Sequence, residues 1–193
     1  MMSLELLNTL AALGTFTVIT ATAIAATVQL RHLRRNNQLQ AVLALRTERN
    51  TQKLDAAFEF VSSELDARLR DPEFRAELDG HVSPSRRIHK ELDLADYYEH
   101  IGTYIKHRLV DEEIYFELGN PGRYWALSAA AIAIYRRARG PRAYENFEYL
   151  ALREKEWNAA HEARTFPKDL QRIDLHDPYL AEDQKRLRDG SRS

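Results

Sequence analysis

The chain has 193 residues, with 28 lysine and arginine residues against 29 aspartate and glutamate residues, and no cysteine. This balance gives no overall field that would draw the protein to nucleic acid, so we expect no nucleic-acid partner. The absence of cysteine excludes disulfides, thiolate zinc sites and cysteine nucleophiles. The length leaves room for one domain of about 100 to 150 residues with a further segment beside it.

An uncharged run from Leu6 to Leu30 provides that further segment. A helix of this length would cover roughly 37 Å, more than the ~30 Å hydrocarbon core of a bilayer. Asn8, Gln29 and six threonines interrupt the run, which leaves a buried soluble helix as an alternative. A cleaved signal peptide fits less well, because the run is too long and no basic residue precedes it. We therefore predict a retained transmembrane anchor over residues 1–30.

Basic residues follow this run at once, at Arg31, Arg34 and Arg35. Lysine and arginine near a span tend to remain in the cytoplasm. The sequence thus predicts a single-pass protein of the cell (inner) membrane, with its N-terminus outside and its C-terminal domain cytoplasmic. The lipid bilayer is then its first expected partner.

Four polar residues of the anchor, Asn8, Thr15, Thr22 and Gln29, lie seven residues apart and share one helix face. Polar side chains can hydrogen-bond between transmembrane helices. One interpretation is a contact face for another helix, most simply a second copy, giving a parallel homo-oligomer whose stalks continue the contact. The other is that each threonine bonds the preceding turn of its own helix.

No glycine or proline occurs between Thr15 and Asp71, which predicts an uninterrupted helix. We expect this helix to leave the membrane as a stalk over residues 31–57 and to join the domain near Phe58. Asn36 and Asn37 are the expected place for a bend, because asparagine side chains compete with the backbone ladder.

The rest of the chain has helical periodicity and no alternating strand pattern, so the expected fold class is all-α, with a compact helical cytosolic domain over residues 58–166. Residues 167–193, which include two prolines and dense charge, are expected to form an extended or disordered tail. We take residues 123–139 as the central helix of the domain. The other predicted helices run from Pro72 to near Gly80, from Glu91 to Leu109, from Asp111 to Leu118 and from Arg142 to His161.

No motif carries a recognisable chemistry. The histidines lack the Glu-x-x-His and His-Glu-x-x-His spacings of di-iron and zinc sites, and the chain has neither a Gly-Lys pair nor a Gly-x-Ser-x-Gly elbow. We therefore expect no metal, no cofactor and no catalytic residue. The alternative is a membrane-tethered enzyme with acid and base groups from Tyr98, Glu99, His100 and Asp111. Neighbours on a helix point in different directions, which disfavours that site.

Several segments together resemble a known family: residues 96–102 (DYYEHIG), 109–113 (LVDEE), Trp125 and residues 144–151 (YENFEYLA). They are similar to a bacterial family of small single-pass membrane proteins classified only as a domain of unknown function. The similarity extends from the anchor to about Trp157, and Arg108 stands where the family pattern has glycine. The resemblance implies a topology and no activity. The resulting expectation is a non-enzymatic interaction module on a membrane anchor, with an unknown protein partner.

Overall fold

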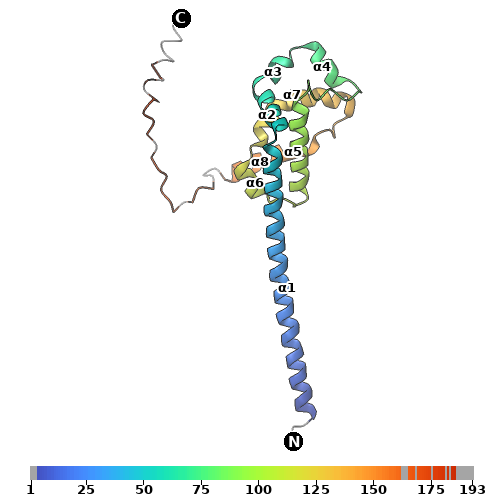
Figure 1. Ribbon diagram of the computed structural model, residues 1–193, viewed down its shortest axis with the longest axis vertical. Helices are drawn as coiled ribbons and strands as arrows, with labels where there is room; N and C mark the ends of the chain where they lie inside the picture. The colour runs from blue at the N-terminus through green and yellow to red at the C-terminus, as the bar shows by residue number, and fades with distance from the viewer. Residues whose placement is uncertain are drawn as a thin grey trace. The chain divides into compact units, whose positions relative to one another are not determined.

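The computed structural model describes residues 4–161, 165–167, 169–174, 176–180, 182 and 184–185. The chain divides into two units, Met1–Ala160 and His161–Ser193. Eight helices, α1 to α8, lie in the first unit, and the described residues contain no strand (Figure 1). The predicted all-α fold class is therefore confirmed. Several residues of the predicted tail lie outside the described residues.

Helix α1 (Leu4–Arg49) contains the whole uncharged run. Every residue from Ala11 to Leu30 is exposed within this chain. The helix passes through Asn36 and Asn37 without interruption, so the predicted bend there is wrong. The end of α1 packs on the domain through the buried Leu45, with Ala41 and Val42 partly buried beside it.

The predicted uninterrupted helix up to Asp71 is also wrong, because the chain leaves the helical path after Arg49. Thr51 adopts an extended conformation, and its hydroxyl accepts a hydrogen bond from the Leu54 N–H at 3.4 Å. A threonine side chain that caps a new helix in this way outweighs helix continuation. Helix α2 (Gln52–Ser63) therefore starts afresh, and α3 (Leu65–Arg68) and α4 (Pro72–Asp79) follow it.

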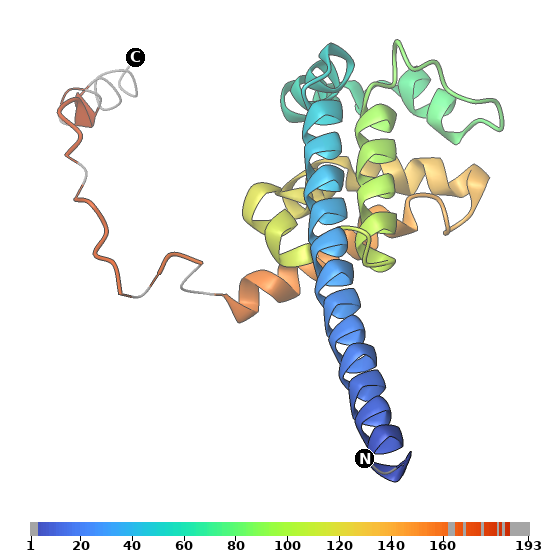
Figure 2. The ribbon, with the colours of Figure 1, turned by 60° about the horizontal axis from the view of Figure 1, so that its bottom comes forward.

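Helix α5 (Glu91–Lys106) has more buried residues than any other helix described in the domain. It contacts α2, α7 (Pro121–Arg139) and α8 (Glu145–Ala160), and runs alongside the end of α1 (Figure 2). Residues 123–139, predicted to form the central helix, belong to α7, which packs against α2, α3, α4, α5 and α8. Fewer residues of α7 than of α5 are buried, because the apolar residues of α7 spread around its axis. Trp125 stays partly buried and Leu127 is exposed. The residues of α5 buried in the domain are Glu91, Leu92, Asp93, Leu94, Ala95, Tyr97, Tyr98, Ile101, Gly102 and Ile105.

Side-chain caps set where the later helices begin. Asp111 accepts hydrogen bonds from the Glu113 and Ile114 N–H groups and starts α6 (Glu112–Leu118). Asn120 accepts from the Arg123 N–H, so α7 begins at Pro121, two residues earlier than predicted. Such caps satisfy backbone donors that a helix leaves unpaired in its first turn.

Helices α5 and α8 approach each other closely at Gly102. A Cβ atom built on Gly102 would stand 2.0 Å from the carbonyl oxygen of Asn146, so only glycine fits there. One turn earlier, the Glu99 carboxylate accepts the Asn146 and Phe147 N–H groups, each at 2.9 Å. An acidic group at a helix N-terminus stabilises both the free N–H groups and the dipole. Glu99 and Gly102 thus fix where α8 starts against α5.

Candidate functional site

The four residues of the alternative enzyme site do not share a cavity. Tyr98 is buried in the core with its ring stacked on Phe147 at 4.7 Å, and burial raises the pKa of its phenol well above 10. Glu99 caps α8, Asp111 caps α6, and His100 is exposed. Three of the four residues therefore hold the fold together, and each lies in different surroundings.

The two threonines of the polar line on α1, Thr15 and Thr22, form hydrogen bonds within their own helix. The Thr15 hydroxyl donates to the Ala11 carbonyl at 2.9 Å, and the Thr22 hydroxyl donates to the Val18 carbonyl at 2.8 Å. This bonding to the preceding turn is the second of the two interpretations given above. Asn8 and Gln29 are exposed on the same face, and the described part of the chain packs nothing against it. A threonine oxygen that donates to its own helix keeps lone pairs for a further donor.

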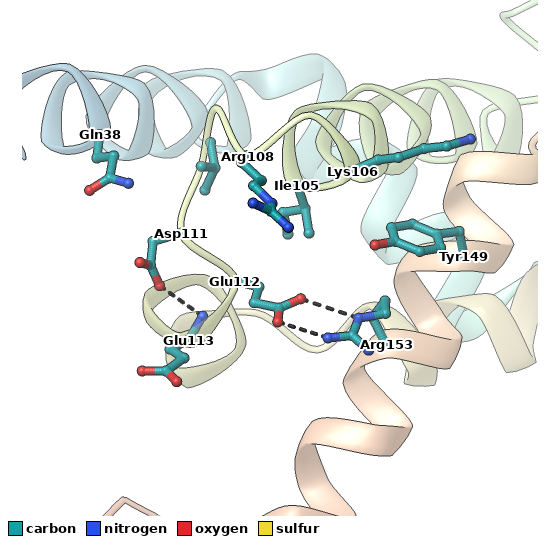
Figure 3. A pocket seen from close by; sticks show the side chains of 10 residues that line it. Gln38, Ile105, Lys106, Arg108, Asp111, Glu112, Glu113, Tyr149 and Arg153 are labelled. Carbon is teal, nitrogen blue, oxygen red and sulfur yellow. Dashed lines mark hydrogen bonds and ion pairs between the residues drawn. The ribbon is translucent and has the colours of Figure 1, made fainter. Parts of the chain in front are cut away.

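An open cleft of about 590 Å³ lies where the end of α5, α6 and α8 meet the stalk (Figure 3). Its lining residues are Gln38, Ile105, Lys106, Arg108, Val110, Asp111, Glu112, Glu113, Tyr149 and Arg153. Gln38 belongs to α1, eight residues beyond Leu30 and thus about 12 Å along the helix from the end of the uncharged run. The cleft consequently lies close to the predicted span.

Part of the charge in this cleft is neutralised internally. Arg153 donates to both carboxylate oxygens of Glu112, at 2.8 and 3.2 Å, and this hydrogen bonding raises the pKa of the guanidinium group. Lys106 donates to the Asn146 side chain at 3.2 Å. The bidentate Arg–carboxylate pair ties α8 to α6 and fixes one wall of the cleft.

Arg108 differs from these residues. Its backbone φ is 58°, in the left-handed region, and its guanidinium has no hydrogen bond or ion pair within the described part of the chain. The Tyr149 hydroxyl and the Glu113 carboxylate, which also line the cleft, have no described side-chain partner either. The Arg108 guanidinium, the Tyr149 hydroxyl and the Glu113 carboxylate are thus available in the cleft for an external polar ligand.

Sequence reasoning identified Asp111 and the unusual Arg108 but missed Tyr149 and Arg153. These two residues stand one turn apart on α8, more than 35 positions along the chain from the end of α5. No local spacing links them to the α5–α6 loop. The positive φ of Arg108 agrees with the expectation of glycine at this position, since glycine adopts a positive φ without steric cost.

A buried histidine lies elsewhere in the domain. The His89 ring contacts Glu91 at 2.8 Å through Nδ1 and Glu77 at 3.1 Å through Nε2, and it lies against the Phe74 ring. His89 and Glu91 are both buried, whereas Glu77 is exposed. Within the described residues, no group of three histidine or acidic side chains is placed to hold a metal ion. These contacts join the loop before α5 to α4.

Comparison with known proteins places the chain in a family. No curated protein and no solved structure matches it. One family model does, a domain of unknown function (DUF4760), over residues 16–157. The matched region starts in the uncharged run of α1 and ends near the last turn of α8, which agrees with the resemblance noted in the sequence. The chain therefore belongs to the DUF4760 family of domains of unknown function.

Proposed function

We propose that this protein is a single-pass membrane protein whose helical domain lies in the cytoplasm and binds a protein partner without catalysing a reaction. The observation that carries the proposal is the exposed apolar surface of α1, where no residue from Ala11 to Leu30 is covered by the rest of the described chain. An apolar helix surface of this extent is stable in lipid and unfavourable in water.

The charge distribution around the span supports the orientation. Arg31 and Arg34 extend into solvent directly after the apolar segment, on the side where α1 continues to the domain. Basic residues on one side of a span favour the cytoplasm for that side. The domain follows the basic residues and would share their compartment, the cytoplasmic side of the cell (inner) membrane.

The cleft beside the stalk supports a binding role. Arg108, Glu113 and Tyr149 present opposite charges and a hydroxyl at its surface without internal partners. Such a mixed set fits a polar segment of a protein better than a ligand of one charge sign. Three of the four residues of the alternative enzyme site are engaged in capping and core packing, which favours binding over catalysis.

Single-cysteine labelling tests the anchor and its orientation, because the natural chain has no cysteine to interfere. Ser3→Cys tags the N-terminal side, and Ser62→Cys tags an exposed position on α2. We expect a membrane-impermeant maleimide to label Ser3→Cys in intact cells and Ser62→Cys only after lysis. The opposite pattern would overturn the orientation, and extraction of the chain by alkaline carbonate would overturn the anchor.

A pull-down from detergent-solubilised membranes tests the binding role. We expect the wild-type chain to retain a partner that Arg108→Ala combined with Tyr149→Phe loses. Arg142→Ala, at an exposed arginine outside the cleft, is the matched control and should retain it. Retention by the double variant would exclude the cleft as the binding surface.

A further inference from the structure

The outer face of α1 continues as a line of residues beyond the membrane. In the sequence, Asn8, Thr15, Thr22 and Gln29 recur every seven residues. Because α1 is one helix to Arg49, the same seven-residue line passes on through Asn36 and Leu43. Five of these six residues are uncharged polar side chains, and all six are exposed.

This line lies opposite the surface of α1 that packs on the domain. At 3.6 residues per turn, Asn36 is about 180° and Leu43 about 160° around the axis from Leu45. Leu45 is 6% exposed, whereas Leu43 is 52% exposed. In Figure 2, α1 passes in front of the domain and its near side is uncovered. The domain of the same chain therefore cannot cover this line.

Lipid cannot cover the part of this line of α1 that lies beyond the membrane either. Leu39 and Leu43 lie about 13 and 20 Å along the helix beyond Leu30, which is past the hydrocarbon of the bilayer. Both leucines are more than half exposed, and they stand four residues apart, so they form an apolar pair in water. Burial of such a pair requires another protein surface.

We infer that a second copy of this chain covers the pair, through a parallel coiled coil formed by the line from Gln29 to Leu43. This inference rests on the proposed membrane anchor, because two chains inserted with the same topology bring identical residues to the same depth. Leu39 then meets Leu39 and Leu43 meets Leu43. Asn36 meets its own copy, and an amide both donates and accepts hydrogen bonds.

In the two heptads from Gln29 to Leu43, three residues fit the positions of a two-stranded coiled coil, Asn36, Leu39 and Leu43, whereas the preceding a and d positions are the polar Gln29 and His32. With Asn36 and Leu43 at heptad position a, Leu39 falls at position d, where leucine favours dimers. A single asparagine at position a fixes the register and the parallel orientation of such pairs. A seven-residue line drifts about 20° per heptad on a straight helix, so two copies would follow it with a left-handed supercoil.

Disulfide crosslinking in membranes tests the inference with the full-length chain. Asn36→Cys and Leu43→Cys lie on the line, and their matched controls are the exposed neighbours Asn37→Cys and Ala44→Cys, about 100° away. Mild oxidation should give a product of twice the chain mass, at least about five times more abundant for Asn36→Cys and Leu43→Cys than for the controls. A disulfide needs Cα atoms within about 7 Å, which makes this readout specific for the contacting face.

A second variant distinguishes a specific dimer from random collisions between chains in the membrane. Leu39→Glu with Leu43→Glu, added to Asn36→Cys, should reduce crosslinking to the level of Asn37→Cys, because four glutamates would then meet in the dimer. Equal crosslinking at Asn36 and Asn37, or a product with a different protein, would exclude a second copy as the partner. If the chain still resists carbonate extraction, the membrane anchor would remain valid. Extraction of the chain by carbonate would overturn the anchor, and with it the shared depth on which the dimer depends.

Discussion

Arg108 holds a backbone conformation that its side chain disfavours. Its φ of 58° places it in the left-handed region between α5 and the loop that leads to α6. For a residue with a Cβ atom, this conformation costs roughly 1–2 kcal/mol. The cost is offset by the packing around it, where Val110 and Ile105 are buried on either side.

Arg108→Gly should therefore raise the free energy of unfolding by about 0.5–1 kcal/mol, which is the relieved strain minus the flexibility that glycine adds to the unfolded chain. Urea unfolding of the full chain in detergent, followed by circular dichroism, measures this change. His107→Gly is the matched control, because His107 has a φ of −93° and gains nothing from glycine. A lower stability of Arg108→Gly than of the wild-type chain would contradict the interpretation.

Glu154 is a buried carboxyl with a single backbone donor. Its Oε2 atom accepts the Gly122 N–H in the first turn of α7, and the side chain is 7% exposed. Burial raises the pKa of Glu154, and the hydrogen bond from Gly122 opposes that shift without cancelling it. The sequence pattern of α8 contained no sign of this burial, because the partner lies 32 residues earlier in the chain.

Glu154→Gln should become progressively more stable relative to the wild-type chain as the pH rises from 4 to 8. Since the folded pKa lies above the unfolded one, the stability that Glu154 contributes is present below the unfolded pKa and is lost as the pH rises through the folded pKa. Glutamine keeps an acceptor for the Gly122 N–H and carries no charge. Thermal unfolding across this pH range measures the difference, with Glu117→Gln at an exposed carboxyl as the control. A difference that shrinks with rising pH would refute the assignment.

At the scale of the helices, α5 and α8 meet at one glycine. Gly102 allows the two backbones to touch, and the Glu99 carboxylate binds the first N–H groups of α8 one turn away. Tyr144, just before α8, has a φ of 60°, and its hydroxyl donates to Asp96 on α5 at 3.1 Å. Three successive turns of α5 thus hold the start of α8, which makes this pair of helices the frame of the domain.

Gly102→Ala should destabilise the domain by about 3 kcal/mol, because the added methyl group would overlap the Asn146 carbonyl and force the helices apart. Gly80→Ala is the matched control: its Cβ would meet no atom closer than 3.4 Å, and its φ of −72° suits alanine. The midpoint of thermal unfolding measures both variants. Equal midpoints for the two would show that α5 and α8 can separate at little cost.

Periodicity predicted most helices of the domain but not how deeply each of them is buried. The apolar spacing of α5 and the breaks at Gly80 and Gly140 were readable because they depend on neighbours in sequence. The break at Thr51 was missed, since it depends on one capping hydrogen bond that competes with a good helical sequence. The deep burial of α5 was missed because burial depends on which helices assemble around it.

The arginines in the last turn of α7, Arg136, Arg137 and Arg139, make contacts that follow only from the assembled fold. Any positive charge at a helix C-terminus complements the helix dipole. In the structure, Arg139 donates to the Leu78 and Val82 carbonyls, and Arg136 donates to the Ala143 carbonyl and pairs with Glu148. These contacts hold the α4 region and the start of α8, and no sequence spacing relates them to α7.

At the scale of the whole chain, the family resemblance predicted the extent of the region that matches the family model but not a site. The cleft gathers residues from α1, the α5–α6 region and α8, so its composition follows only from the assembled fold. The orientation of α1 on the domain decides which of its faces remains open. Leu45 is the residue that fixes this orientation, because it is the one buried leucine of α1 in the described structure.

Leu45→Ala should loosen the end of α1 from the domain. Loss of a buried leucine side chain costs roughly 2–5 kcal/mol, and about 2 kcal/mol already corresponds to a 30-fold change in a local opening equilibrium. Hydrogen exchange of the full chain in detergent should therefore accelerate at least about 30-fold over residues 41–49. Leu43→Ala removes the same atoms from the open face and, in monomeric detergent-bound chain, should change this exchange little. Equal acceleration in both variants would mean that α1 is not held by Leu45, and that the face assigned to the second copy is not fixed by the domain.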